Sequence, residues 1–336
     1  MKKLNVAMWG KAVSVMPKLE KAEWDELDFV SRWLISTRFA AIIMTVTTVV
    51  ITGLLAARDG YFSAGLFLLL LVGLVFAHST NNLLNDYTDY VRGIDKDNYF
   101  REQYGPHPLG RGFMTKQKLL TNAAINGAIA AAAGIALIFL RGGLVLPLMA
   151  VGAVFVLFYT YPFKYIALGE IIMLITWGPL MVGGGYYVLS GVWSWNVALA
   201  GLAYSLGVTA TLFGKHIDKI SEDKKKGVHT MPVVLGEKAA RYVGLAMFVL
   251  EYAVVGYLIA VGYFSLFLLV VLLALPMFFK TLLPMWRHPR PDAPPPGYPA
   301  GSWPLWFVGT GFIYARRWGF LYILGIILDS LYRLIV

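Results

Sequence analysis

Long stretches without a charged residue constrain this chain more than any other feature of its sequence. Of its 336 residues only 14% are charged and 58% are hydrophobic, whereas soluble domains carry about 25% charged residues. A helix that crosses a bilayer needs about 20 mostly apolar residues, and the charge-free stretches are long enough for that. Because so few charges cannot cover a water-facing surface, we expect an integral membrane protein that crosses the bilayer several times.

The positions of the charges predict the individual spans. Four charge-free stretches fit one helix each, and two longer stretches, which break at a turn or a glycine, fit two helices each. A ninth helix is expected around residues 318–328. The single-helix stretches are 39–57, 60–85, 119–140 and 142–163, and the longer ones are 171–214 and 242–279, the last of which contains only Glu251 as a charge. The prediction is an all-α, polytopic fold with nine transmembrane helices.

The distribution of basic residues orients these spans. With a cytoplasmic N-terminus, all but three of the 29 Lys and Arg lie on the cytoplasmic side, and the exceptions are Arg58, Arg141 and Arg333. This asymmetry follows the positive-inside rule and explains the net charge of +10 without a nucleic-acid partner. We therefore expect a multi-pass protein of the plasma or inner membrane, surrounded by lipid, whose site opens to the cytoplasmic side.

The segments outside the spans differ in character. Residues 1–28 interleave lysines with apolar residues but lack the continuous apolar core of a signal peptide. They predict an amphipathic cytoplasmic segment ahead of a transmembrane domain at 29–336. The proline-rich stretch 287–304 predicts an irregular loop. The cytoplasmic loops 81–118 and 215–241 are the most polar, so chemistry is expected there.

The first acidic cluster lies at the end of the second predicted span. Asn82, Asn85, Asp86 and Asp89 follow the spacing i, i+3, i+4 and i+7 and so share one face of a helix. Helix stability does not explain them, because carboxylates at a helix C-terminus oppose the macrodipole. Clustered oxygen ligands suit Mg²⁺, which completes its shell with water and substrate phosphates. A solvated helix end without a function is the alternative.

The second acidic cluster, Asp218, Glu222 and Asp223, lies at the end of the sixth span. A salt-bridged, solvated helix end explains this cluster equally well when it is taken alone. Its position four spans after the first cluster and on the same side favours two similar halves in one orientation over an inverted repeat. Several cations suited to anionic oxygens lie near the clusters, namely Arg92, Lys96, Arg101, Arg111, Lys116, Lys164, Lys215 and Lys219.

These features together predict a binding site for a diphosphate. Mg²⁺ held by the two acidic helix ends, together with several basic side chains, would neutralise the charge on phosphate oxygens. The surrounding spans offer an apolar chamber for a hydrocarbon tail. An isoprenyl diphosphate is the substrate that combines a diphosphate with such a tail.

At these residues the chain resembles the UbiA superfamily of intramembrane prenyltransferases. The first motif, 82–89 with Gly93 and Asp95, is most similar to the branch that acts on 1,4-dihydroxy-2-naphthoate. The stretch Tyr161-Pro162-Phe163-Lys164 resembles the tyrosine–proline–lysine element of the family. Further similarities lie at 168–170, 177–179, 185–187 and 229–236.

The second motif departs from the family pattern. The family usually has two aspartates four residues apart, but Lys219 stands four residues before Asp223, and Asp218 stands one place further back. Either Asp218 and Glu222 act as a pair on a regular helix, or a distorted turn brings Asp223 and Asp218 to the metal.

The resemblance implies nine helices around a central cavity that the two motif loops cap on the cytoplasmic side. It implies two or more Mg²⁺ ions, one held by Asp86 and Asp89 and another by Asp218, Glu222 or Asp223, and these five residues are the candidate catalytic and metal-binding groups. Lys164 and Arg111 would steady the leaving diphosphate. The candidate substrate-binding residues are Asn82, Asn85, Arg111, Tyr161, Lys164, Lys215 and Lys219.

The reaction implied by the resemblance is prenyl transfer. The diphosphate leaves as an allylic cation forms, aromatic faces stabilise that cation, and an electron-rich ring carbon of an aromatic quinone precursor attacks it. A terpene cyclase of the same superfamily, or a transferase with another acceptor, would share the donor-side residues. An ion-coupled transporter is the alternative from another class, although two acidic clusters on one membrane face argue against it.

Overall fold

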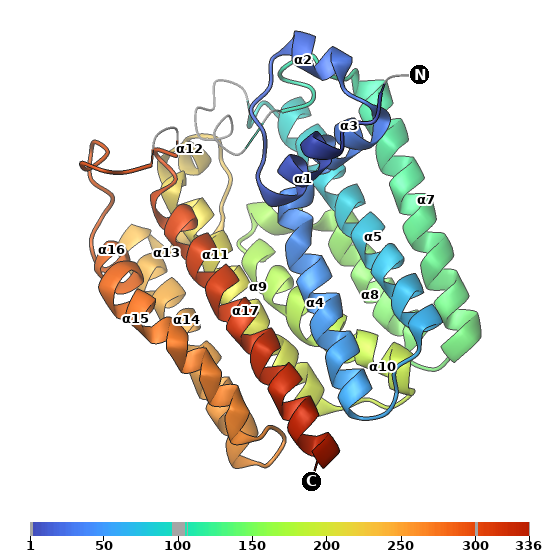
Figure 1. Cartoon of the computed structure of the whole chain (residues 1–336). Helices are drawn as coiled ribbons and strands as arrows, with labels where there is room; N and C mark the ends of the chain where they lie inside the picture. The colour runs from blue at the N-terminus through green and yellow to red at the C-terminus, as the bar shows by residue number, and fades with distance from the viewer. Residues whose placement is uncertain (1–2, 96–104, 106, 300–301, 336) are drawn as a thin grey trace.

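The computed structural model describes residues 3–95, 105, 107–299 and 302–335, and within them the chain is a helical bundle (Figure 1). No strand occurs in these ranges, and one isolated β-bridge joins Ile166 to His229. Eight helices of the described chain are long and apolar enough to cross a membrane. A further apolar helix, α8 (Val145–Phe158), is shorter. The predicted all-α, polytopic architecture is confirmed.

The membrane-spanning helices follow the charge-free stretches closely. Two of the spans are composites, in which short α-, 3₁₀- and π-helical pieces continue one another. The single helices are α4 (Phe39–Arg58), α5 (Ala64–Val91), α7 (Lys116–Arg141), α11 (Trp195–Asp218), α14 (Glu237–Ala260) and α17 (Trp306–Ile335). The composites are α9 (Gly169–Ile175) with η2 (Thr176–Gly183) and α10 (Gly184–Ser190), and η3 (Leu266–Ala274) with α15 (Leu275–Met277), η4 (Phe278–Leu282) and α16 (Leu283–Arg287).

The stretch 142–163 forms a shorter helix than its length predicts. After α8 ends at Phe158, the chain turns through Pro162 into the 3₁₀-helix η1 (Phe163–Tyr165). Proline lacks the amide hydrogen that would continue the helix, and it disfavours the helical conformation at the residue before it. The turn carries Lys164 into the interior, where only 4% of its surface is exposed.

A second proline bends the chain beside the interior cavity described below. Pro179 lies within η2, where the turns widen to π-helix and Gly178 leaves the helical region, with φ −97° and ψ −105°. Pro179 cannot supply the amide hydrogen of a regular helical turn, and π-helical turns often mark functional segments. The irregular segment places Trp177 against α4 near Thr45.

Helix α11 forms the centre of the larger hydrophobic core. It is the most buried of the candidate spans, and it packs against η2, α14 and α17. Small residues along α11 let these neighbours approach closely. A Cβ atom on Gly214 would lie 2.8 Å from the backbone carbonyl carbon of Phe307, so glycine is required where the start of α17 crosses α11.

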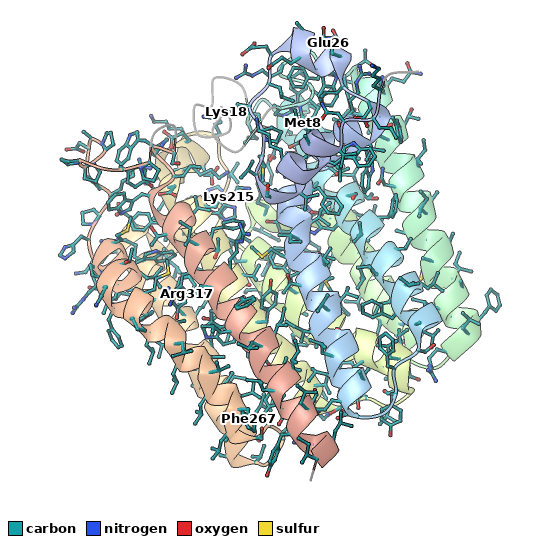
Figure 2. The ribbon with its side chains drawn as sticks, in the orientation of Figure 1. Met8, Lys18, Glu26, Lys215, Phe267 and Arg317 are labelled. Carbon is teal, nitrogen blue, oxygen red and sulfur yellow. The ribbon has the colours of Figure 1, made fainter. Side chains whose placement is uncertain are left out.

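Three short N-terminal helices cover one end of the bundle: α1 (Val6–Ser14), α2 (Lys21–Glu26) and α3 (Phe29–Ser36). The helices α12 (Ile220–Lys225) and α13 (Met231–Leu235) lie at the same end, and the C-terminus lies at the other (Figure 1). Figure 2 shows Lys215 towards the end that bears Lys18, and Phe267 near the opposite end. The rings of Trp24 and Phe113 stack with centroids 4.8 Å apart, which joins the N-terminal helices to the loop after α5.

The three arginines that violate the charge asymmetry all have local partners. Arg58 lies 2.8 Å from an oxygen of Asp59 and 3.2 Å from an oxygen of Asp329, and Arg333 lies 3.3 Å from Asp329. Arg141 donates hydrogen bonds of 2.7 and 2.6 Å to two backbone carbonyl oxygens at the end of α10. Acidic side chains therefore pair with Arg58 and Arg333, and carbonyl oxygens satisfy Arg141.

Candidate active site

The last turns of α5 carry the first acidic cluster. The helix continues without a break to Val91, so Asn82, Asn85, Asp86 and Asp89 share one face, as their spacing predicts. Asp86 and Asp89 are buried although both are acidic. Buried carboxylates require partners or ligands, because burial without either is costly.

Lys164 is the principal partner of Asp89. Its Nζ atom donates hydrogen bonds of 2.9 and 2.7 Å to the two oxygens of the Asp89 carboxylate, and Asn85 donates another of 3.1 Å to the same group. Burial lowers the pKa of Lys164, but the nearby Asp89 and Asp223 carboxylates outweigh it, so the pKa is raised. Lys164 therefore stays cationic at neutral pH, inside the protein and beside the first cluster.

Arg38 belongs to the same site, although sequence reasoning did not select it. One of its terminal nitrogens donates 3.1 Å hydrogen bonds to the backbone and side-chain oxygens of Asn82 and to the side-chain oxygen of Asn85. The same nitrogen lies 3.7 Å from a carboxylate oxygen of Asp86. In the sequence, Arg38 looks like any basic residue that precedes a span and orients it in the membrane. Only the fold therefore identifies Arg38 as part of the site.

His107 also approaches the first cluster, and it fixes the position of Asp95. Its Nδ1 accepts hydrogen bonds from the amides of Leu109 and Gly110, at 3.2 and 3.3 Å. The ring proton therefore resides on Nε2, which donates a 2.9 Å hydrogen bond to Asp95. Ligand atoms of Asp86, Asp95 and His107 lie within 4.8 Å of one another. Because both histidine nitrogens are engaged, the groups suited to a cation here are the carboxylates.

The second acidic cluster has a break in its helix. Helix α11 ends at Asp218, Lys219 adopts the non-helical values φ −121° and ψ 23°, and α12 then begins at Ile220. The break places Lys219 Nζ 2.9 Å from Asp223 Oδ1. Asp223 is only 1% exposed, and its Oδ2 atom accepts no hydrogen bond from the described part of the chain.

The other two carboxylates of the second cluster have different surroundings. Asp218 accepts 3.0 Å hydrogen bonds from the amides of Phe307 and Val308 and so caps the first turn of α17. Glu222 is partly exposed and accepts a 2.8 Å hydrogen bond from the Ser221 hydroxyl. The structure thus brings Asp223 near Lys164, whereas the carboxylate of Asp218 caps α17.

Several predicted substrate-binding residues lie away from the buried cluster. The side chain of Arg111 is 38% exposed and lies 3.4 Å from Glu20. Tyr161 is 48% exposed, and the guanidinium of Arg92 lies 3.6 Å above its ring. Lys215 is half-buried in the last turn of α11. Two further basic candidates, Lys96 and Arg101, lie outside the described residues.

Glu170 and His216 form a buried pair next to the second cluster. His216 Nδ1 lies 2.6 Å from Glu170 Oε1, which also accepts a 3.2 Å hydrogen bond from the amide of Met231. These contacts join α9, α11 and α13 at the end of the bundle that carries both acidic clusters. They fix the relative positions of these three helices around the site.

A cavity of about 380 Å³ lies directly along α5 from the first cluster. Its walls come from α5, α7, α8 and the composite span of α9, η2 and α10, and they are mostly apolar. Residues 70–81 of α5 line it, which corresponds to about 17 Å along the helix at about 1.5 Å per residue. Its volume falls within the range of small-molecule sites, about 300–1,000 Å³. A hydrocarbon chain could occupy it with its polar end at the acidic cluster.

Comparison with known sequences agrees with these features. The profile of the UbiA prenyltransferase family matches residues 45–302. A 1,4-dihydroxy-2-naphthoate octaprenyltransferase of Escherichia coli (strain K12) is 28% identical over 277 residues, which cover 78% of this chain and 87% of that protein. A protein of the same name from Bacillus subtilis (strain 168) is 27% identical over 215 residues, which cover 63% of this chain and 68% of that one.

Solved structures share the fold. A structure described as digeranylgeranylglyceryl phosphate synthase aligns over 93% of this chain and 99% of its own, with a TM-score of 0.56 and 16% identity. A UbiA homologue from Archaeoglobus fulgidus, bound to GPP and Mg²⁺, aligns over 85% of this chain and 99% of its own, with a TM-score of 0.50 and 15% identity. The protein, a multi-pass integral membrane protein with this fold, therefore belongs to the UbiA prenyltransferase family.

Proposed function

We propose that the protein transfers an isoprenyl chain from an allylic prenyl diphosphate to an aromatic, naphthoate-like quinone precursor. The observation that carries this proposal is the position of the apolar cavity, which follows α5 as far as Asn81, about two helical turns before the buried Asp89–Lys164 pair. One molecule with a diphosphate head at the pair would extend a hydrocarbon tail into the cavity. The names of the two bacterial relatives support a naphthoate acceptor.

The residues present suit Mg²⁺, which prefers carboxylate oxygens. Asp223 offers a buried oxygen that accepts no hydrogen bond within the described chain, and the carboxylates of Asp86 and Asp95 approach each other within 4.8 Å. We assign one ion to Asp86, Asp89 and Asp95 and another to Asp223. When bound, Mg²⁺ neutralises the diphosphate charge and favours its departure.

The remaining groups act through the protein itself. Lys164 and Arg38 are cations fixed at the first cluster, where they would bind diphosphate oxygens and stabilise the leaving group. The apolar wall excludes water, which would otherwise quench an allylic cation. Trp177 lines the cavity near α5, and its ring would stabilise a nearby cation.

The proposal includes the arrangement in the membrane. Residues 1–28 form a cap on the cytoplasmic side, and residues 29–336 form the transmembrane domain, whose motif loops 81–118 and 215–241 face the same side. This assignment rests on the excess of Lys and Arg at the end of the bundle that carries both clusters.

Product analysis tests the proposal directly. Purified protein with Mg²⁺, geranylgeranyl diphosphate and a panel of hydroxylated naphthoates and benzoates should form a prenylated naphthoate, detected by mass spectrometry. A hydrocarbon product formed without any acceptor would indicate a terpene cyclase instead. Ion or solute flux in proteoliposomes, without loss of the diphosphate, would indicate a transporter.

Metal removal tests the assignment of the carboxylates. We expect EDTA to abolish product formation and added Mg²⁺ to restore it, because uncompensated carboxylates would repel a diphosphate. Zinc and magnesium should be compared, since carboxylate sites favour magnesium. Undiminished turnover in metal-free buffer would contradict the role given to both acidic clusters.

A further inference from the structure

His78 is a polar residue on the wall of a mostly apolar cavity. It lies on α5 one helical turn before Asn82, on the face that carries the first acidic cluster. Its ring lines the cavity, and its Nδ1 atom lies 2.7 Å from the hydroxyl oxygen of Thr45 on α4. The proposed function leaves this histidine without a role.

The hydroxyl of Thr45 determines which nitrogen of His78 carries the proton. Thr47, Thr48 and Thr52 on the same helix each donate a 2.9 Å hydrogen bond to the backbone carbonyl four residues earlier. Thr45 makes no such bond within the described chain, and its oxygen instead accepts a 3.4 Å hydrogen bond from the indole of Trp177. Its own proton is thus directed to His78 Nδ1, which leaves the ring proton on Nε2.

The Nε2–H group of His78 is an unused donor. It makes no hydrogen bond with the residues that the structure describes. Other polar side chains on the wall use their donors internally: Thr80 and Thr176 bond to carbonyls of their own helices, and Asn81 donates to the carbonyl of Val156. The ring of His78 lines the cavity, so this donor is available to a ligand that carries a hydrogen-bond acceptor.

We propose that His78 binds an oxygen of the aromatic acceptor through Nε2–H and thereby orients the acceptor ring beneath the diphosphate site. A prenyl tail has no oxygen to accept this bond, whereas a hydroxylated or carboxylated aromatic has several. Trp177, whose ring centroid is 6.1 Å from that of His78, offers an aromatic face to the same ring. His78 and Asp86 are eight positions apart, about 12 Å along the helix, a distance comparable to the length of the ring and the reacting end of the donor together.

This inference rests on the proposed function, and substitutions at His78 test it. His78→Leu removes the donor, whereas His78→Gln keeps an N–H group near the position of Nε2. We expect His78→Leu to raise the KM for the acceptor about 10- to 100-fold, the usual cost of leaving one buried acceptor oxygen without a donor. The KM for the prenyl diphosphate should change less than about twofold, and His78→Gln should recover most of the loss.

Matched variants separate this role from a loss of packing. Thr45→Val removes the hydroxyl that fixes the tautomer of His78, so it should raise the acceptor KM. Thr48→Val on the same helix should not. If His78→Leu does not fold, the glutamine and Thr45 variants still decide the question.

The outcomes distinguish the inference from the function on which it rests. If wild-type protein prenylates no aromatic compound, the proposed function fails first. If wild-type protein is active and His78→Leu keeps a normal acceptor KM, or raises both KM values equally, only the role of His78 is wrong. Calorimetric titration of the acceptor in the absence of diphosphate should show weaker binding to His78→Leu and near-normal binding to His78→Gln.

Discussion

At the scale of single residues, the buried ion pair between Lys164 and Asp89 is explained by function better than by the stability of the fold. Taking both charges out of water carries a desolvation cost, and apolar residues of similar volume stabilise a fold at least as well. The pair lies beside Arg38 and within the electrostatic reach of Asp223. A charged substrate that binds among these buried groups would explain why so many charges of opposite sign lie inside the protein.

Substitution of either partner is expected to affect activity and stability together. Asp89→Asn or Lys164→Gln should lower turnover about 100-fold or more, because each removes a charge that stabilises the transition state. Each should also cost about 3–5 kcal/mol of stability, since it leaves one buried charge without its partner. Turnover by mass spectrometry and thermal unfolding in detergent measure the two effects.

The double variant Asp89→Asn/Lys164→Gln is the control for these substitutions. It removes both charges, so it should recover much of the stability but none of the activity. A double variant with wild-type turnover would show that the pair is structural alone.

The three carboxylates of the second cluster should respond differently to amide substitution. Asp223→Asn should lower turnover strongly, because it alters a buried oxygen assigned to metal. Asp218→Asn should lower the unfolding temperature, because the amide side chain keeps only one of the two oxygens that accept from the start of α17, a loss of about 1 kcal/mol. Glu222→Gln should change neither quantity much, since its side chain is partly exposed. Strong loss of turnover with Glu222→Gln and none with Asp223→Asn would reverse our assignment.

The spacing of these residues in the sequence does not reveal this difference. Asp218 meets the amides of Phe307 and Val308, which lie 89 and 90 residues further along the chain. The break at Lys219 likewise has no proline or glycine to mark it. The family register around Asp223 is visible in the sequence, but the cap and the break depend on contacts made only in the folded protein.

At the scale of elements, the length of the charge-free stretches predicts the spans, because the thickness of the bilayer sets how long an apolar helix must be to cross it. In 142–163 the helix is shorter than predicted, because Pro162 ends it early, and charge-free length says little about the N-terminal segment. In the structure that segment is folded by Asp28, which accepts hydrogen bonds from the amides of Ser31 and Asn5 and from the indole of Trp9. Burial raises the pKa of Asp28, but these hydrogen bonds outweigh it and hold the pKa below its usual value.

Removal of the Asp28 carboxylate should loosen the N-terminal cap. Asp28→Ala is expected to cost about 1–2 kcal/mol, because it removes a helix N-cap together with two longer-range hydrogen bonds. Asp25→Ala in the same segment is the control, and it should cost less than about 0.5 kcal/mol because its side chain is exposed. Thermal unfolding in detergent compares the two. Since the pKa of Asp28 is lowered, its contribution is present above the ordinary pKa and is lost as pH falls through the lowered value.

At the scale of the whole molecule, both acidic clusters lie at one end of the bundle. Both acidic clusters, the N-terminal helices and α12 share that end, whereas the C-terminus lies at the other (Figure 1). Two clusters on the same side agree with two halves in one orientation. Their convergence could be predicted from the sequence, because each follows a span that runs in the same direction. The closeness of Arg38 and His107 could not.

Reporter fusions test the sidedness of this arrangement. We expect a fluorescent protein fused before Met1 to fold in the cytoplasm and alkaline phosphatase fused after Val336 to be active outside it, because the excess of basic residues orients the bundle. The exchanged fusions, with phosphatase at the N-terminus and the fluorescent protein at the C-terminus, are the controls and should be inactive. The opposite pattern would invert the topology and place the site on the outer face.

The contact between Arg58 and Asp329 joins residues 271 positions apart in the chain, at the end of the bundle away from the acidic clusters. Since the ribosome makes α4 before α17, this contact can form only after α17 has been synthesised. Until then, Asp59 is the acidic neighbour available to Arg58. A nascent chain that lacks α17 therefore lacks this link between α4 and α17.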